Sequence, residues 1–546
     1  MKNKNIVLVG LFIATVVASF SLLAQNTPSN NETLIFDPEA YTTLAVSVDN
    51  ALMEVRRYQV VYVANPVRMA ENQPGGRRPT VLPNPFAYQS MDIYVPQTAY
   101  ESSDAAIILY VGNSGWRAST APQGVEQGGV YVSNSDTDRI GAALQAGYLI
   151  ASAGTRSRGA VAADDSWGGK APAAVVDAKA AIRYLRLNDA VIPGSAERVI
   201  ITGTSGGGAL SVAVAASGNS PDYLPYLAEI GAAGINEDGS SSLRDDVFGT
   251  VAYCPITDLG HSDAAYEWQY GALREASNNA RGEYTEQMKN ASASLAASYP
   301  GYLAGLGLRL EDGTPLTEDN MAETIVAHLK LEIEEVIAEG VDIPAIGEDF
   351  VLESRFGSQT LVNDWLRIEN GQISDIDYEL FLRFVIESQP LKTVPGFDTT
   401  ANTGNQGSSG ENTLFGLDSQ EYSNFTKYAW NNNEVNGDGT GFDDTDLEWD
   451  DYITESESLL DAQLKMVNSM PYLGSDADSA PYWYVRHGVV DRDTAFALQI
   501  ALYYAIVNDS SVLDVNFELV WLQPHGGNYD VQDAYSWIAA KLAEDE

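Results

Sequence analysis

The chain has 546 residues, of which 45% are hydrophobic and 10% aromatic, a composition typical of a large globular protein. Its 31 Lys and Arg residues against 75 Asp and Glu residues give a formal charge of −44. This charge argues against nucleic acid and against an anionic membrane surface as partners, because both are bound through cationic side chains. We interpret the acidic surface as favouring solubility, with no catalytic role.

The N-terminus has the pattern of a secretory signal peptide. Lys2 and Lys4 precede an almost wholly apolar run, and Ala24 stands before the polar segment QNTPSNNET. This predicts a signal peptide over residues 1–24, cleaved after Ala24, and a secreted or periplasmic protein. An uncleaved anchor is the alternative, because the run approaches a membrane-spanning length. No second run of that length follows, so no stable membrane association is expected after cleavage.

Short apolar segments alternate with helix-like ones from about residue 90 to 255. MDIYVP, AAIILYVGN, AGYLIASAG, ERVIITG and VFGTVAYCP are predicted strands, and DTDRIGAALQAG and APAAVVDAKAAIRYLRLND are predicted helices. Strand and helix in alternation predict an α/β fold, with a mostly parallel sheet covered by helices on both faces. We assign the first part of this core to residues 40–257.

The alternation stops in the middle of the chain and returns near its end. Residues 258–461 contain helix-like stretches such as MAETIVAHLKLEIEEVIAEG, followed by glycine-rich polar loops, and are predicted to form a large, mainly helical lid insertion. Residues 462–546 restore strand and helix and form the second part of the core. The acidic loop 431–446 either binds a cation or is simply solvated; Asp443 stands where a calcium loop has glutamate.

The segment IITGTSGGGAL contains a possible nucleophile. Gly203-Thr204-Ser205-Gly206-Gly207 is a G-x-S-x-G sequence that follows a predicted strand and opens a predicted helix. This is the context of a nucleophile elbow, in which the serine occupies a sharp strained turn and its neighbours must be small. An incidental glycine-rich turn is the alternative interpretation.

A nucleophilic serine needs a histidine base and a carboxylate, which follow it in the order acid, histidine in this type of fold. Of the four histidines, only His525 in WLQPHGGNY follows both a late strand and a suitable acid. That acid is Asp491, with Asp493 as a close rival. His487 is interpreted as a structural, hydrogen-bonded histidine. The single cysteine, Cys254, excludes an intramolecular disulfide and is expected to be a buried packing residue.

An oxyanion hole requires two backbone donors. Gly206, directly after the serine, supplies one, and the loop after the strand AAIILYV supplies the other, from Gly112 or Asn113. No H-E-x-x-H sequence, cysteine pair, histidine cluster or phosphate-binding loop occurs, so neither a metal site nor a cofactor is predicted.

Together these segments resemble the bacterial tannases, or tannin acyl hydrolases. The resemblance extends over APAAVVDAKAAIRYLRLNDAVIPGSAERVIITGTSGGGALS, VAYCPITDLGHSDAAYEWQY, YVRHGVVDRDTAF and LVWLQPHGGNYD, and more patchily over SQPLKTVPGFD and GENTLFG. It implies an α/β-hydrolase fold with a large lid, and a serine esterase that hydrolyses galloyl esters with Ser205, Asp491 and His525. The implied partner is a small phenolic ester.

The resemblance also implies a set of residues that bind the gallate hydroxyls: Lys392, Glu411 and Asp493. This gives Asp491 and Asp493 separate roles. Taken without the resemblance, Lys392 and Glu411 are ordinary surface charges. Fungal tannases place bridged cysteines beside the serine and the histidine, whereas this chain has Thr204 and Gly526 there. The segment between Lys392 and Glu411 is glycine- and asparagine-rich, which leaves the position of Glu411 open.

Two other functions remain open from the sequence. A feruloyl or other hydroxycinnamoyl esterase, or a general carboxylesterase, would use the same triad on a different acid. An inactive hydrolase fold used for binding is disfavoured, because such proteins usually lack a triad residue and all three are present here.

Overall fold

The computed structural model describes residues 30–74, 80–354, 357–400, 410–433, 447–454 and 459–545. The expected signal peptide, 1–24, and most of the acidic loop 431–446 lie outside these ranges. Among the described helices, none combines the length and the apolar character needed to cross a membrane.

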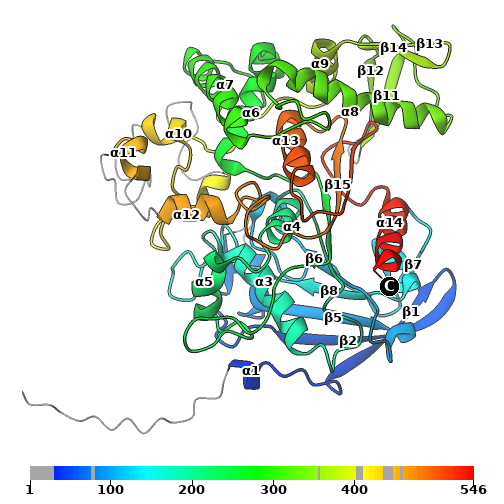
Figure 1. The fold of residues 1–546 in the computed structure, drawn as a ribbon, viewed down its shortest axis with the longest axis vertical. Helices are drawn as coiled ribbons and strands as arrows, with labels where there is room; N and C mark the ends of the chain where they lie inside the picture. Colours follow the sequence, from blue (N-terminus) through cyan, green and yellow to red (C-terminus); the bar gives the residue numbers. More distant parts are fainter. Residues whose placement is uncertain are drawn as a thin grey trace, which may run out of the picture.

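The central sheet has ten strands in the order β16-β15-β10-β9-β6-β8-β5-β2-β1-β7. In the view of Figure 1, β15 lies highest among its labelled strands, and β6, β8, β5 and β2 follow below it. Its strands are β1 (Tyr41–Val48), β2 (Ala51–Val61), β5 (Ser90–Pro96), β6 (Ile107–Val111), β7 (Val130–Tyr131), β8 (Leu149–Ala153), β9 (Val199–Thr204), β10 (Gly249–Tyr253), β15 (Tyr482–Gly488) and β16 (Asp514–Val520). All neighbouring pairs from β16 to β8 are parallel. The predicted α/β fold with a mostly parallel sheet is therefore confirmed.

The sheet extends further toward the N-terminus than the sequence pattern predicted. β1, β2 and β5 pair in antiparallel fashion, and β5 joins them to β8. β1 and β2 were not predicted as strands, because β1 alternates buried and exposed residues and β2 carries Glu54, Arg56 and Arg57 among its apolar residues. Such a pattern suits a strand near the sheet edge with one covered face rather than a buried central strand.

Helices cover both faces of the sheet. In β6, Ile107, Leu109 and Val111 face one apolar cluster, and Ile108 and Tyr110 face the other. Because both faces are covered, every residue of β6 is buried and the strand has a continuous apolar sequence. The first cluster includes α3 (Ala173–Leu187), α4 (Gly206–Ala216), α5 (Leu224–Glu229) and α13 (Phe496–Val507), together with helices from residues 258–466. The second includes α2 (Arg139–Ala146) and α14 (Val531–Glu544).

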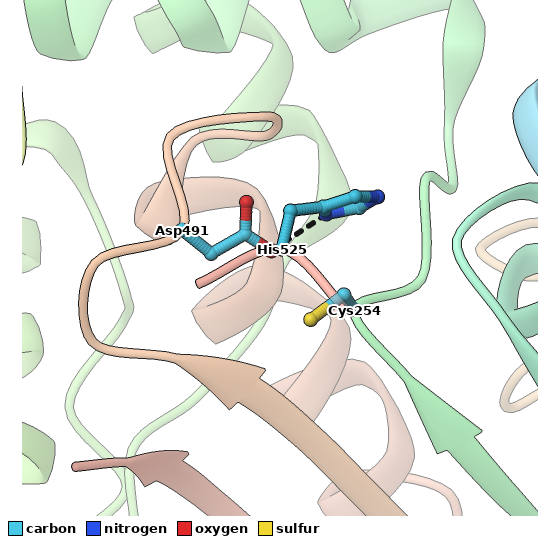
Figure 2. Close-up of side chains that lie close together, drawn as sticks. All are labelled: Cys254, Asp491 and His525. Atoms are coloured by element: carbon cyan, nitrogen blue, oxygen red, sulfur yellow. Dashed lines mark hydrogen bonds and ion pairs between the residues drawn. The ribbon is translucent and has the colours of Figure 1, made fainter. Parts of the chain in front are cut away.

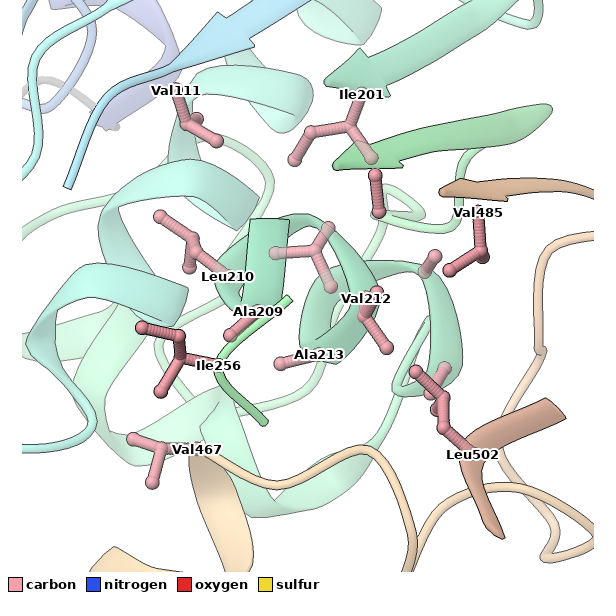
Figure 3. Close-up of a cluster of buried hydrophobic side chains, with 14 of the residues drawn as sticks. Val111, Ile201, Ala209, Leu210, Val212, Ala213, Ile256, Val467, Val485 and Leu502 are labelled. Atoms are coloured by element: carbon pink, nitrogen blue, oxygen red, sulfur yellow. The ribbon is translucent and has the colours of Figure 1, made fainter. Parts of the chain in front are cut away.

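Helix α4 lies at the centre of the core, and all of its residues are buried. Side chains from three strands, from α13 and from the segments after β10 and α12 surround it (Figure 3): Val111, Ile201, Val485, Leu502, Ile256 and Val467. A helix without an exposed face cannot shift without opening the core, so the residue at its N-terminus is held in place.

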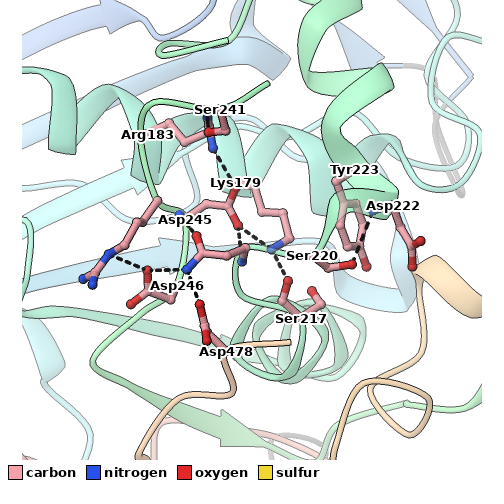
Figure 4. A network of polar contacts seen from close by, with 12 residues as sticks. Lys179, Arg183, Ser217, Ser220, Asp222, Tyr223, Ser241, Asp245, Asp246 and Asp478 are labelled. Atoms are coloured by element: carbon pink, nitrogen blue, oxygen red, sulfur yellow. Dashed lines mark hydrogen bonds and ion pairs between the residues drawn. The ribbon is translucent and has the colours of Figure 1, made fainter. Parts of the chain in front are cut away.

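A buried polar network fixes the other end of α4 (Figure 4). Asp245 accepts from Lys179 Nζ at 2.8 Å and from Arg183 Nη1 at 3.0 Å, and Lys179 also donates to the Ser217 carbonyl just after α4 at 2.7 Å. Lys179, Arg183 and Asp245 are all buried. Because each charge has a charged partner and further hydrogen bonds, the network joins α3 to α4 without an unpaired buried ion.

The chain between β10 and β15 contributes no described strand to the ten-stranded sheet. Its helices are α6 (Leu259–Tyr270), α7 (Glu286–Leu306), α8 (Glu318–Ala338), α9 (Tyr378–Ser388), α10 (Lys427–Asn431), α11 (Trp449–Thr454) and α12 (Leu459–Met466). Two antiparallel hairpins, β11 (Asp349–Ser354) with β12 (Gly357–Val362) and β13 (Leu366–Glu369) with β14 (Gln372–Ile376), lie between α8 and α9 and were not predicted. The remaining short elements are α1 (Asn30–Thr33), β3 (Asn72–Gln73) and β4 (Thr80–Val81).

Candidate active site

Ser205 occupies a strained turn between β9 and α4. Its φ of 63° and ψ of −123° lie in a region that residues with a side chain rarely adopt. The next residue must be glycine, because a Cβ at Gly206 would lie 2.2 Å from the Trp116 nitrogen and 2.3 Å from the Asn113 carbonyl oxygen. The glycines thus allow the start of α4 to approach the loop after β6. This is the geometry of a nucleophile elbow, with the serine at the carboxyl edge of the sheet.

The structure brings Ser205, His525 and Asp491 together from the segments that follow β9, β16 and β15, at one edge of the sheet. His525 Nε2 lies 2.9 Å from Ser205 Oγ, and His525 Nδ1 lies 2.8 Å from Asp491 Oδ2. Asp493, the rival acid, lies farther away, with its Oδ2 3.7 Å from His525 Nδ1. Since Nδ1 faces a carboxylate, that nitrogen carries the proton and Nε2 is free to accept the serine proton.

Asp491 is fully buried and its orientation is fixed by a second contact. Its Oδ1 accepts the backbone N–H of Asp493 at 2.8 Å. Burial raises the pKa of Asp491, but the adjacent His525 and His487 rings outweigh burial and hold that pKa well below its usual range. Burial lowers the pKa of His525, whereas the Asp491 carboxylate raises it to well above the ordinary value. The pair therefore stabilises a protonated imidazole, which is the state that forms when serine loses its proton.

Two further side chains, both interpreted from the sequence as structural, lie against the triad. Cys254 is fully buried, as expected, but it follows β10 directly and packs beside Asp491 and His525 (Figure 2). His487, at the end of β15, has its Nδ1 3.4 Å from Asp491 Oδ2, the same oxygen that bonds His525. Neither ring nitrogen of His487 forms a hydrogen bond of standard geometry among the described residues, but the Asp491 carboxylate and the Cys254 thiol lie against the ring and raise its pKa despite burial.

The loop after β6 borders the serine as predicted for an oxyanion hole. Gly112, Asn113 and Ser205 line one cleft of about 450 Å³. Asn113 is buried, its φ is 48°, and its side chain donates to the Arg117 carbonyl and accepts from Thr155 Oγ1, so the loop is held by its own contacts. That Gly206 and either Gly112 or Asn113 supply the two backbone N–H donors stays a prediction. A larger cavity of about 810 Å³ beside α6, α7 and α10–α12 contains none of these residues.

Lys392 and Asp493 lie beside the triad. Lys392 Nζ is 3.5 Å from Asp493 Oδ1 and 5.0 Å from the centre of the Phe397 ring. Burial raises the pKa of Asp493, but Lys392, His525 and Arg492 together lower it below the usual value. Lys392 is therefore a partly buried, paired cation rather than an ordinary surface charge.

Glu411 approaches the site from a different side. It is buried, and its Oε1 lies 3.6 Å from Arg158 Nη2. Arg158 also donates through Nε to the Gly115 carbonyl and through Nη1 to the Gly410 carbonyl. Arg158 thereby connects Glu411 to the loop after β6, a link that no sequence motif indicated. No described contact joins Glu411 to Lys392 or Asp493.

Asp263 holds the segment that carries Lys392. Its Oδ1 accepts the backbone N–H groups of Gly396 at 2.6 Å and Phe397 at 3.0 Å, and its Oδ2 accepts that of Asp398 at 2.8 Å. Burial raises the pKa of Asp263 to about 6 despite these three donors. The carboxylate of α6 thus anchors the turn that follows Lys392.

We expect Asp263→Asn to destabilise the fold by about 1–3 kcal/mol, because the new amide NH₂ must face at least one backbone N–H and leave it unpaired. Equilibrium unfolding in urea measures the effect. Asp377→Asn is the matched control, since Asp377 accepts only from the Leu380 N–H at an exposed helix start, where asparagine serves equally well. Equal unfolding midpoints for the two variants would contradict the anchoring role.

Comparisons with known proteins agree with this geometry. The BD-FAE family model matches residues 91–297. The crystal structure of Fusobacterium nucleatum tannase is 30% identical, with a TM-score of 0.72, 93% of this chain and 99% of that chain being covered. Tannin acyl hydrolase from Lactobacillus plantarum is 28% identical, with a TM-score of 0.73 and coverage of 94% and 100%. A tannin acyl hydrolase in complex with ethyl gallate is 29% identical, with a TM-score of 0.73 and coverage of 94% and 99%. A search of curated proteins found no significant match.

Proposed function

Because this chain belongs to the family of bacterial tannases, within the tannase and feruloyl esterase-like α/β-hydrolases, we propose that it hydrolyses galloyl esters through an acyl-enzyme on Ser205. It is a carboxylic ester hydrolase, and small phenolic esters are its substrates. The observation that carries the proposal is the chain of hydrogen bonds from Ser205 Oγ through His525 to Asp491 at a strained strand-to-helix turn.

The reaction follows from this geometry. Ser205 Oγ attacks the ester carbonyl while His525 Nε2 takes the serine proton, and Asp491 stabilises the imidazolium through Nδ1. The tetrahedral oxyanion accepts from the N–H of Gly206 and from one N–H of the loop at Gly112 and Asn113. His525 then returns the proton to the leaving alcohol. In the second half, water attacks the acyl-enzyme with His525 again as base, and the free acid leaves.

The acyl preference is proposed to come from three charged groups. Lys392 and Asp493 lie beside His525, where the ring of an acyl group bound to Ser205 would pass, and they form a donor and an acceptor for phenolic hydroxyls. Glu411, held by Arg158 near the loop after β6, supplies a second acceptor. A ring without hydroxyls would leave these buried groups unpaired, which costs more binding energy than a lost methylene does.

We propose that residues 1–24 are a signal peptide and that the reaction therefore takes place outside the cytoplasm. With a single cysteine the exported protein has no internal disulfide and must rely on its hydrophobic core, which a chain of 546 residues can provide. N-terminal sequencing of the exported protein would identify the cleavage position, and a start at Gln25 is expected.

Hydrolysis of methyl gallate beside methyl ferulate and nitrophenyl acetate tests the proposed acyl preference. We expect kcat/KM for methyl gallate to exceed that for methyl ferulate by at least about tenfold, because ferulate carries a methoxy group and a propenoyl spacer that displace its hydroxyl from Lys392 and Asp493. The BD-FAE match makes a feruloyl esterase the second candidate. A reversed preference would support that candidate, and turnover of the activated acetate alone would mean a general carboxylesterase.

A further inference from the structure

A thiol, a carboxylate and an imidazole meet behind the catalytic serine. Cys254, Asp491 and His525 follow β10, β15 and β16, which are adjacent parallel strands, so their carboxyl ends share one edge of the sheet. One ligand atom of each residue lies within 4.8 Å of the other two (Figure 2). The proposed ester hydrolysis uses the carboxylate and the imidazole but gives the thiol no role.

The three donor atoms suit a thiophilic divalent cation. Zinc is bound by cysteine sulfur at about 2.3 Å, by histidine nitrogen at about 2.0–2.1 Å and by carboxylate oxygen at about 2.0–2.2 Å. The present separation of His525 Nδ1 and Asp491 Oδ2 is 2.8 Å, bridged by one proton. If an ion replaces this proton, the imidazole and the carboxylate need to move only slightly farther apart. A thiolate and a carboxylate together neutralise the charge of the ion, as a buried site requires.

The surroundings of the cluster provide independent support for a ligand. His487 is completely buried, its Nδ1 is directed at Asp491 Oδ2 at 3.4 Å, and both of its ring nitrogens lack a hydrogen-bond partner among the described residues. Buried polar atoms without partners are uncommon in native proteins, and each calls for an explanation. Asp493 Oδ2, 3.7 Å from His525 Nδ1, adds negative charge on the more open side.

We propose that Cys254, Asp491 and His525 form a binding site for a thiophilic divalent cation such as Zn²⁺ or Cd²⁺, and that an ion bound there reversibly stops ester hydrolysis. Binding releases the Cys254 thiol proton to solvent, and the proton on His525 Nδ1 moves to Nε2, so the ring stays neutral. The inhibitory part rests on the proposed triad, because the ion occupies Nδ1 and Nε2 carries the remaining ring proton. His525 Nε2 can then no longer take the serine proton.

The burial of the site predicts that an ion binds and leaves slowly. Cys254 and Asp491 have no exposed surface, and only the His525 side chain, 18% exposed, faces the solvent. An ion must therefore displace the His525 ring or wait for a local opening before it reaches the thiol. Inhibition is expected to develop slowly after mixing and to reverse slowly when a chelator is added.

Titration of the full-length exported protein with Cd²⁺ tests binding directly. Cadmium bound to a thiolate has an ultraviolet charge-transfer absorption, and Cys254 is the only cysteine, so the signal reports this site alone. We expect the absorption to saturate in the wild-type protein and to be absent in Cys254→Ser and Cys254→Ala. Both variants should keep most of the ester hydrolysis, while the Zn²⁺ concentration for half inhibition rises by at least about tenfold, the loss typical of even an outer metal partner.

His261→Gln is the matched control for binding at ordinary histidine and aspartate pairs. His261 Nδ1 lies 2.9 Å from Asp258 Oδ1, as in the triad, and no thiol belongs to that pair. This variant should be inhibited like the wild type. Equal zinc sensitivity of Cys254→Ser and wild type, inhibition without the cadmium absorption, or full activity with saturated cadmium would each overturn the proposal. If the metal-free protein hydrolyses no ester, the proposed function fails, whereas the cadmium titration still decides the site.

Discussion

Replacement of Ser205 by alanine is expected to lower kcat for methyl gallate by at least about 10⁴-fold, the scale of loss when a triad nucleophile is removed. Without Oγ no acyl-enzyme forms, and water must attack the ester with only His525 and the oxyanion donors to assist it. KM should change little, since the acyl ring is proposed to be bound by Lys392 and Asp493 rather than by the serine. Steady-state kinetics with methyl gallate measures both constants.

The fold should tolerate this change. Ser205 contributes its backbone to α4, where its carbonyl accepts the Ala209 N–H at 2.9 Å, and alanine retains that contact. Ser211→Ala is the matched control: it removes a buried hydroxyl from the same helix, where Ser211 Oγ bonds only the Gly207 carbonyl at 2.9 Å. This control should keep nearly full activity. Substantial hydrolysis by Ser205→Ala, with Ser211→Ala unaffected, would mean that another group is the nucleophile.

The local part of the site was predictable from the sequence. A strand, a G-x-S-x-G turn and a helix lie next to one another in the chain, and the small residues reveal how closely α4 approaches the loop at Asn113. The order of serine, acid and histidine then left one histidine, His525. The sequence could not decide between Asp491 and Asp493 without the family resemblance, because a difference of 2.8 Å against 3.7 Å from Nδ1 depends on how the chain turns after β15.

The parts of the site that depend on strand order were not predictable. Cys254 and His487 lie beside the triad because β10, β15 and β16 are neighbours in the sheet, and no spacing along the chain encodes that pairing. For the same reason, the expectation of no metal site considered only ligands that are close in sequence. The role of Arg158 was missed because it donates to the backbone carbonyls of Gly115 and Gly410, and contacts to backbone atoms leave no motif in the sequence.

The insertion shows a different limit. The helices α7 and α8 are long and amphipathic, and their pattern predicted them well. The hairpins at 349–362 and 366–376 consist of short strands with mostly exposed residues, so no apolar alternation marks them. Their position is set by packing of Phe350 and Trp365 against α9 and against Trp521 after β16. Such long-range contacts outweigh local propensity.

Lys392→Met is expected to lower kcat/KM for methyl gallate by about 10²- to 10³-fold and to change nitrophenyl acetate hydrolysis by less than about threefold. Methionine keeps an unbranched apolar side chain against Phe397 but removes the ammonium group that is proposed to bind a gallate hydroxyl. The loss on gallate exceeds that of one neutral hydrogen bond, because a charged group is removed and Asp493 loses its partner at 3.5 Å.

The control for this variant is Lys465→Met. Lys465 likewise pairs with an aspartate, Asp222, at 2.7 Å and lies 5.5 Å from the centre of the Tyr472 ring, but it belongs to α12 and does not contact the triad. Its replacement should leave both substrates unaffected. Equal losses on gallate and acetate in Lys392→Met would mean that Lys392 acts through Asp493 on the charge of His525. A loss confined to gallate would mean that Lys392 recognises the acyl ring and does not take part in the reaction at the ester bond. Both variants retain Ser205, His525 and Asp491, so the catalytic groups themselves are unchanged.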